Sequence, residues 1–183
     1  SLYAIDNERM KINWFLNLNR SIDLNPNNLF SSKQIVSDGN NIVISTEDKT
    51  YIINANNGSI MFKKEFSAKL KPLIVGNYLF IITKNNFLVC TDLKTGNLVY
   101  SYNINQKIAD FMKTKKKEVV LKDITMANDR ILLFLENSYV LRFNVNGNLE
   151  EINKLPSKMK TLPIFVNNSI YFLDKKNRLT IVN

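Results

Sequence analysis

Carboxylates are the residues with which this sequence could do acid–base chemistry, because its 183 residues include no histidine. Asp6 and Asp92 each follow a short apolar run, where a carboxylate could act as a general base. Two further candidates are pairs of adjacent acids, Glu47–Asp48 and Glu150–Glu151. The lack of histidine removes the commonest general base, the histidine-dependent triads and most zinc sites.

A turn explains Asp6 and Asp92 better than catalysis does. The equivalent positions of the repeat described below carry Asn54, Asn144 and Asn183. Both Asp and Asn start turns, because their side-chain oxygens accept hydrogen bonds from the backbone two residues on.

The other reactive groups also favour structural roles. The adjacent acids lie in turns or at strand starts, which is typical of solvated side chains, and Cys90 lies in an apolar strand, as a small core residue would. No glycine-rich phosphate loop, zinc spacing or nucleophile elbow is present. We therefore predict no catalytic residue, no metal ligand and no cofactor site, and we expect that the chain is not an enzyme.

A repeat positions these residues. "LVCTDLKTGNLVYSY" (88–102) contains a β-type run, an acidic residue, a Thr-Gly turn and an aromatic residue four positions after the glycine. The same order recurs in "SLYAIDNERMKINW" (1–14) and "TYIINANNGSIMF" (50–62). It recurs also in "YVLRFNVNGNLEE" (139–151), where the turn is one residue shorter and Glu151 takes the place of the aromatic. In the copy at 1–14, Met10 takes the place of the glycine and Trp14 that of the aromatic. The glycine supplies the positive φ of the turn, and the aromatic is placed to pack against a neighbouring sheet.

The spacing of the copies indicates a propeller. Short apolar runs precede each copy, so the unit is a four-stranded meander, and its period averages about 44 residues, as in a propeller blade. We predict an all-β fold, a β-propeller of about four four-stranded antiparallel blades that begins in a third strand and forms part of a larger, eight-bladed propeller. Residues 1–183 would form a single, partial propeller domain. It could close as a four-bladed ring, stay open, or pair with a second copy.

Two insertions interrupt the period, near 19–33 and 105–119. The second could be a short helix with Ile108, Phe111 and Met112 on one face, or an irregular loop that tucks these residues against a blade. Its run "KTKKKE" could be a solvated loop or a partner contact. The candidate partner-contact residues are Phe111, Lys115, Lys116 and Lys117.

The net charge of +9 could suggest nucleic acid or an anionic membrane surface. The lysines are scattered, however, and the chain is crowded with Asn, Lys and Ile, a mix that codon bias produces. We predict no nucleic-acid partner.

The motifs resemble the quinoprotein-type (PQQ-like) propeller repeat, most closely in "SLYAID", "LKTGNLVY" and the position of Trp14. The resemblance implies a propeller. An enzyme of this type would hold a quinone and calcium with an aspartate base, and several such enzymes carry a vicinal cysteine pair, which one cysteine cannot form.

Among non-enzymatic members, the chain resembles the BamB family of outer-membrane assembly lipoproteins. That implies a periplasmic protein-binding scaffold, with an outer-membrane anchor as an option in the full-length protein. Its partner would be an outer-membrane assembly component or a nascent outer-membrane protein, and propeller halves could self-associate. The alternatives are a fragment of a PQQ-dependent dehydrogenase and a ligand-sensing propeller ectodomain.

Overall fold

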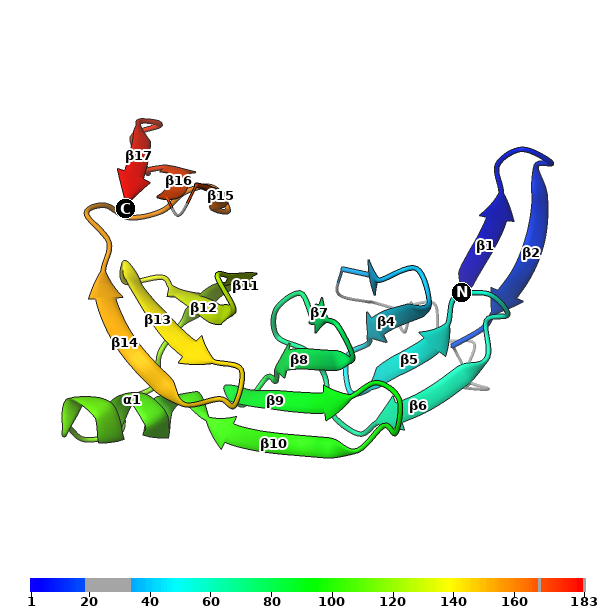
Figure 1. The fold of residues 1–183 in the computed structure, drawn as a ribbon, viewed down its shortest axis with the longest axis horizontal. Coiled ribbons are helices and arrows are strands. Elements are labelled where there is room, and N and C mark those ends of the chain that lie inside the picture. The colour runs from blue at the N-terminus through cyan, green and yellow to red at the C-terminus, as the bar shows by residue number, and fades with distance from the viewer. Residues whose placement is uncertain (19–33, 168, 183) are drawn as a thin grey trace, which may run out of the picture. The chain divides into compact units, whose positions relative to one another are not determined.

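Antiparallel sheets make up the fold, and the computed structural model describes residues 1–18, 34–167 and 169–182 (Figure 1). The first sheet pairs β1 (Leu2–Asp6) with β2 (Lys11–Leu16). The next contains, in order, β3 (Val36–Ser37), β4 (Asn41–Ser45), β5 (Thr50–Asn54) and β6 (Ile60–Lys64). The third contains β7 (Leu73–Val75), β8 (Tyr78–Ile82), β9 (Phe87–Asp92) and β10 (Leu98–Asn103).

The remaining elements follow a helix, α1 (Ile104–Met112). One sheet contains β11 (Leu121–Ala127), β12 (Arg130–Leu135), β13 (Tyr139–Asn144) and β14 (Leu149–Lys154). The last contains β15 (Ile164–Val166), β16 (Ser169–Leu173) and β17 (Leu179–Val182). In each sheet the strands lie in chain order, which is the meander that the repeat predicted.

Burial explains why the central strands are continuously apolar. Four of the five residues of β8 are buried, and so are the last five of the six residues of β12. Strands that are covered on both faces lose the alternation of polar and apolar residues. The outer strand β6 keeps exposed positions and carries Lys63 and Lys64.

The chain forms two compact units. Ser1–Lys84 and Thr91–Leu98 make the first, and Asn85–Cys90 and Val99–Asn183 make the second. In the first unit, residues of neighbouring sheets form a core: Val43, Ile52, Ala68, Leu79, Ile81 and Leu93. The corresponding core of the second unit contains Leu132, Phe134, Val140, Leu155, Met159 and Phe172.

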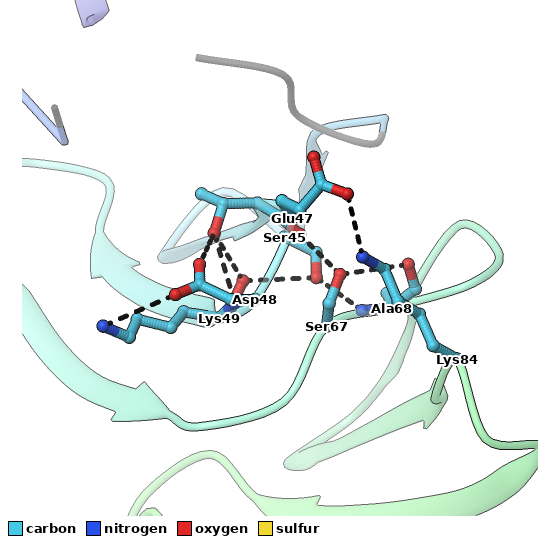
Figure 2. Close-up of polar contacts among 8 residues, drawn as sticks. Ser45, Glu47, Asp48, Lys49, Ser67, Ala68 and Lys84 are labelled. Atoms are coloured by element: carbon cyan, nitrogen blue, oxygen red, sulfur yellow. Dashed lines mark hydrogen bonds and ion pairs between the residues drawn. The ribbon is translucent and has the colours of Figure 1, made fainter. Parts of the chain in front are cut away.

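A buried polar network ties two sheets of the first unit together (Figure 2). The Ser45 hydroxyl accepts a hydrogen bond from the Ala68 amide at 2.6 Å and lies 2.8 Å from the Thr50 hydroxyl. Ser67 donates to the carbonyl of Thr46, and Figure 2 also shows Lys84 reaching the Glu47 carboxylate at 3.3 Å. The chain after β6 is therefore fixed to the β4–β5 turn before it enters the next sheet.

The fold class is confirmed, because the sheets are antiparallel and propeller-like. The β1–β2 sheet corresponds to the third and fourth strands of one repeat unit. Each of the next three sheets contains all four strands of a unit, and β15–β17 correspond to the first three strands of another. It stays a prediction that residues 1–183 form a single, partial domain of an eight-bladed propeller. The insertion predicted near 19–33 lies outside the described residues.

The insertion near 105–119 contains a helix, so the irregular-loop alternative is wrong for its first half. Asn103 caps α1 by accepting a hydrogen bond from the Gln106 amide. The packed face is not the expected one, because Ile104 and Ala109 are buried while Phe111 is 47% exposed.

Candidate functional site

The candidate acids of the repeat lie in turns. Asp92 Oδ1 accepts hydrogen bonds from the amides of Lys94 and Thr95 at 2.7 and 2.9 Å. Asp6 and Asn54 accept bonds from the equivalent amides, two and three residues on. Asn144 starts its turn by accepting from the amides of Asn146 and Asn148. The bond from the Thr95 amide, with that from Lys94, lowers the pKa of Asp92. A carboxylate held in this way is a weak base near neutral pH.

The adjacent acids are engaged by cations. Glu150 lies 2.6 Å from Arg130, and Glu151 lies 3.1 Å from Arg142. Cys90 is buried. Within residues 1–18, 34–167 and 169–182, no group of three or more Cys, Asp or Glu side chains is placed to hold a metal ion.

An aromatic ring lies on the glycine of the next hairpin at successive copies. Trp14 covers Gly58, where an added Cβ would meet the ring at 2.5 Å, and Phe62 covers Gly96 with a corresponding distance of 2.4 Å. The Trp14 Nε1 also donates to the Ala55 carbonyl at 2.9 Å. The aromatic position of the repeat therefore holds one hairpin against the next, as the sequence predicted.

Tyr100 continues this series within the second unit. It stacks on Tyr102 with ring centroids 5.1 Å apart, and both rings cover Gly147. Burial raises the pKa of Tyr100, so its hydroxyl stays protonated and donates to the Val145 carbonyl at 3.0 Å.

The next copy departs from the series at two paired positions. In the β5–β6 hairpin the cross-strand pair is Ile52 and Phe62, two residues before the Asx residue and four after the glycine. In the β13–β14 hairpin the same positions carry Arg142 and Glu151, which form an ion pair. Ile52 is fully buried, whereas the side chains of Arg142 and Glu151 are 45% and 47% exposed.

A cleft lies beside this ion pair, between the β11–β14 sheet and the β15–β17 sheet of the second unit. Its volume is about 850 Å³, within the range of roughly 300–1,000 Å³ that is typical of ligand sites. Its apolar walls include Leu132, Val140, Leu155, Phe165, Ile170 and Val182. Its cations are Arg130, Arg142 and Lys154, and none of the described residues that line it is acidic.

The insertion is attached to the rest of the second unit through Asn86. This side chain is 1% exposed, and its amide donates to the Val119 carbonyl at 3.1 Å and to Asn105 Oδ1 at 3.5 Å. The Val119 amide donates to the same Asn105 oxygen at 3.2 Å, and the Asn86 carbonyl accepts from the Ile104 amide at 2.9 Å. Both ends of the insertion are thus fixed at one point.

The predicted partner-contact residues lie on this insertion and are exposed. Phe111 lies near the end of α1, and Lys115, Lys116 and Lys117 follow it in the segment that leads to β11. Exposed apolar residues accompany them, since Met112 is 53% exposed. The insertion therefore presents apolar and cationic groups on a segment whose ends are fixed.

Two features of the site escaped the sequence prediction. Arg142 was not singled out, although its place two residues before the Asx residue is apolar in the copies with Ile52 and Cys90. Comparing equivalent positions would have found it. Asn86 gave no signal, because its role depends on a hydrogen bond to a residue 33 positions away.

Asp174 gives the second unit a dependence on pH. Its carboxylate is buried and accepts hydrogen bonds from the amides of Lys176 and Arg178, and it pairs with the Arg178 side chain at 2.7 Å. The backbone bond from Arg178 is the main cause that lowers the pKa of Asp174. A folded-state pKa below the unfolded value means that this carboxylate stabilises the fold above about pH 4 and that its contribution disappears as the pH falls through the folded pKa.

The variant Asp174→Asn tests this dependence. At about pH 6 we expect it to unfold at lower urea concentration than the wild type, and the gap should shrink towards about pH 3. Urea denaturation at intermediate pH values measures the gap. A gap that stays constant with pH would contradict the assignment.

Among the residues that the structure describes, no helix is long and apolar enough to cross a membrane.

No protein-family model and no curated protein matches the sequence. Among solved structures, the computationally designed Ika4 protein is similar, with a TM-score of 0.60, 11% identity, and coverage of 84% of this chain and 91% of that chain. A protein of unknown function from Bacteroides caccae has a TM-score of 0.54 and 14% identity, covering 99% of this chain and 68% of its own. At these identities the likeness concerns the fold alone.

BamB from Moraxella catarrhalis also matches, with a TM-score of 0.44, 12% identity and coverage of 80% of this chain. The chain spans 56% of the length of that BamB chain. A likeness at this level carries no argument about function.

Proposed function

We propose that this chain is a non-enzymatic, protein-binding scaffold that acts in outer-membrane β-barrel assembly in the periplasm. The observation that carries the proposal is the surface of the insertion. Phe111 and Met112 are 47% and 53% exposed, and Val120, at the end of the lysine run, is 62% exposed. Large apolar side chains gathered beside cations are typical of surfaces that a partner covers.

The way the insertion is held supports binding rather than mere solvation. Asn86, Asn105 and Val119 fix both ends through hydrogen bonds, and Lys107 lies 4.0 Å over the Tyr102 ring. A segment that is already ordered loses less conformational entropy when it binds. The partner that fits this surface has acidic groups next to apolar ones.

The membrane-assembly role rests on the sequence. The turn and aromatic motifs, with Asp92, Gly96 and Tyr100 in order, resemble the quinoprotein-type propeller repeat, and among non-enzymatic proteins of that type the chain resembles the BamB family. The partner would be an assembly component or a nascent outer-membrane protein. Such a client exposes apolar and polar residues in alternation, so one segment can meet both parts of the insertion surface.

The test uses a urea-unfolded outer-membrane β-barrel protein diluted into buffer with the full chain. We expect the wild type to suppress light scattering, and the variant lacking residues 107–117 to lose most of this effect while keeping its β-type circular dichroism. The quadruple variant Phe111→Ala, Lys115→Glu, Lys116→Glu, Lys117→Glu should do the same, because it removes the apolar anchor and reverses the charges.

The control is Lys175→Glu with Lys176→Glu, two exposed lysines in the β16–β17 turn. It should behave as the wild type. Equal protection by all variants would contradict a role of the insertion. Stoichiometric binding of pyrroloquinoline quinone with calcium, followed by alcohol-dependent dye reduction, would contradict a non-enzymatic scaffold.

A further inference from the structure

The lysines of the second unit gather at one end of its sheets. In an antiparallel meander, the turn between the second and third strands lies at the same end as the connections that enter and leave the sheet. The register agrees, because Leu121 at the start of β11 pairs with Leu135, and Tyr139 pairs with Lys154. All lysines that the structure describes between residues 99 and 182 lie at this end or on the insertion attached to it, and we call this surface the cationic end: Lys107, Lys113, Lys115, Lys116, Lys117, Lys122, Lys154, Lys158, Lys160, Lys175 and Lys176.

Hydrogen bonds join the segments of the cationic end. Lys122, just after the insertion, donates through Nζ to the Met159 carbonyl in the connection between β14 and β15. That connection is joined in turn to the β16–β17 turn, since the Lys175 amide donates to the Lys158 carbonyl at 3.0 Å. The insertion, the connection and the turn therefore form one continuous surface.

The opposite end of the same sheets carries no such charge. Its turns are 128–129, 145–148 and, at the start of β16, the described residue Asn167, and none of these contains a lysine. A bias in codon usage would place lysines at both ends. It can therefore explain how many lysines the chain has, but not where they lie.

Acidic groups do not neutralise the cationic end. Within the described residues, none of its lysines forms an ion pair with a carboxylate. The buried Asp174 is taken by Arg178, at 2.7 Å. The other acids at this end are Asp110, Glu118 and Glu136, which are exposed, and Asp123, which is half-buried in β11. The lysines outnumber them, so this surface is complementary to an anionic partner.

The exposure of the β16–β17 turn does not depend on where the chain stops. The β8–β9 turn is its equivalent in a sheet that has all four strands. An isolated bridge joins Thr83 in the one turn and Asp174 in the other to the preceding connection, and the two residues that follow each of them are exposed. A fourth strand after β17 would therefore leave Lys175 and Lys176 accessible.

Apolar side chains lie on the same surface, at both ends of the lysine run of the insertion. Phe111 and Met112 close α1 and are 47% and 53% exposed, and Val120 follows the run and is 62% exposed. A weak apolar anchor next to a polybasic patch is the combination that holds a protein on a membrane surface, because neither contribution is sufficient alone.

We infer that the cationic end docks on the surface of an anionic phospholipid bilayer, with Phe111 and Met112 entering the headgroup region. Lysines suit this partner, because each is a flexible point charge that can follow mobile phosphates without a fixed geometry. Each basic residue near an anionic leaflet raises binding about fivefold. The inference goes beyond the protein-binding role proposed above and does not rest on it.

The test is sedimentation of the full chain with vesicles of phosphatidylcholine alone or mixed with phosphatidylglycerol. We expect binding to the mixed vesicles to be at least about tenfold stronger than to the neutral ones, and to weaken as salt is raised, because salt screens exposed charges. Equal binding to both kinds of vesicle would overturn the inference.

The decisive variant is Lys175→Glu with Lys176→Glu, which lies outside the insertion. It should weaken binding to the mixed vesicles at least about tenfold. The matched control is Lys11→Glu with Lys94→Glu, which makes the same change in net charge at exposed lysines in two Asx turns of the first unit and should bind as the wild type does. Equal losses in the two variants would show that only net charge matters and would overturn the inference.

A milder variant keeps the test informative if the new acids beside Asp174 disturb the fold. Lys175→Gln with Lys176→Gln removes the two charges without adding acids, so it should weaken vesicle binding in the same direction by a smaller factor. Wild-type binding by this variant would contradict the inference.

The predicted insertion of Phe111 has its own readout. Trp14 is the only tryptophan in the sequence, so the wild-type emission can be subtracted from that of Phe111→Trp. Brominated lipid in the mixed vesicles should quench the remaining emission and shift it to the blue. An emission that the vesicles leave unchanged would contradict entry into the headgroup region.

The two proposals can fail separately. Lys175→Glu with Lys176→Glu is expected to protect the unfolded β-barrel client as the wild type does, so loss of vesicle binding with full protection supports a membrane contact distinct from client binding. Loss of both activities would show that one surface serves a single partner and would contradict the membrane contact. Tighter binding to a single-stranded oligonucleotide than to the mixed vesicles would replace the bilayer with nucleic acid as the anionic partner.

Discussion

Gly96→Ala is expected to lower the free energy of unfolding by about 3 kcal/mol, one of the largest effects of a single methyl group in this chain. Two costs combine. Gly96 has a φ of +72°, where an L side chain is strained, and the new Cβ would lie 2.4 Å from Phe62 Cδ1. The ring is partly buried and packs against the inter-sheet core, so moving it away from the new Cβ would lose part of that packing.

Gly76→Ala is the matched control. Gly76 also has a positive φ, +55°, but nothing lies within 4 Å of an added Cβ. It should therefore show the backbone cost alone, about 1–2 kcal/mol. Urea denaturation of the two variants measures the difference, which is the contribution of the ring on the glycine.

A double-mutant cycle with Phe62→Leu separates the clash from other effects. In that background Gly96→Ala should cost less, because a leucine side chain leaves room above the turn. Equal losses for Gly96→Ala and Gly76→Ala, or additivity with Phe62→Leu, would mean that the ring does not hold the hairpins together.

The repeat can be predicted from the sequence because each of its recurring residues is required within a single hairpin. An Asx residue, a turn with positive φ and an aromatic four residues later are all needed within one hairpin, so Asp92, Gly96 and Tyr100 predicted both the turn and the inter-sheet contact. Met10 illustrates the same point, since it takes the place of the glycine with a φ of 51°. Period and fold class follow from counting such hairpins.

Features that depend on distant partners could not be predicted in this way. The start of α1 is held by the Asn103 cap and by the bond of the Ile104 amide to the distant Asn86 carbonyl, and its buried residues include Ile104 and Ala109. The ion pair of Arg142 and Glu151 stands where the β5–β6 hairpin has Ile52 and Phe62. Such a replacement becomes visible only when the copies are compared position by position and the register of the pairs is known.

Asn86→Asp is the second substitution with a large expected effect. Asn86 is buried, it has a φ of 58°, and its amide donates to the Val119 carbonyl and to Asn105 Oδ1. Asp tolerates the same backbone conformation, so the change removes only the donor and places a carboxylate against two oxygens. At about pH 7 we expect a loss of about 2–4 kcal/mol in the free energy of unfolding.

The loss should depend on pH with a defined sign. Burial and the facing oxygens raise the pKa of the introduced carboxyl above its unfolded value, so the folded state binds more protons than the unfolded state does. The loss relative to the wild type is then smallest below about pH 4, where a protonated carboxyl can donate to the Val119 carbonyl, and it grows as the pH rises through the raised pKa. Asn85→Asp, at the exposed neighbouring position, should change stability little at any pH.

Amide hydrogen exchange reports the local consequence. Because Asn86 fixes both ends of the insertion, its substitution at neutral pH should speed exchange of the Val119 amide and of the amides of α1, while the β12 and β13 amides keep their protection. A loosened insertion would also lose the order that favours binding, so protection of the unfolded β-barrel client should fall even though Phe111 and the lysines are unchanged. Uniform acceleration across the second unit would show instead that Asn86 stabilises the whole unit rather than holding the insertion.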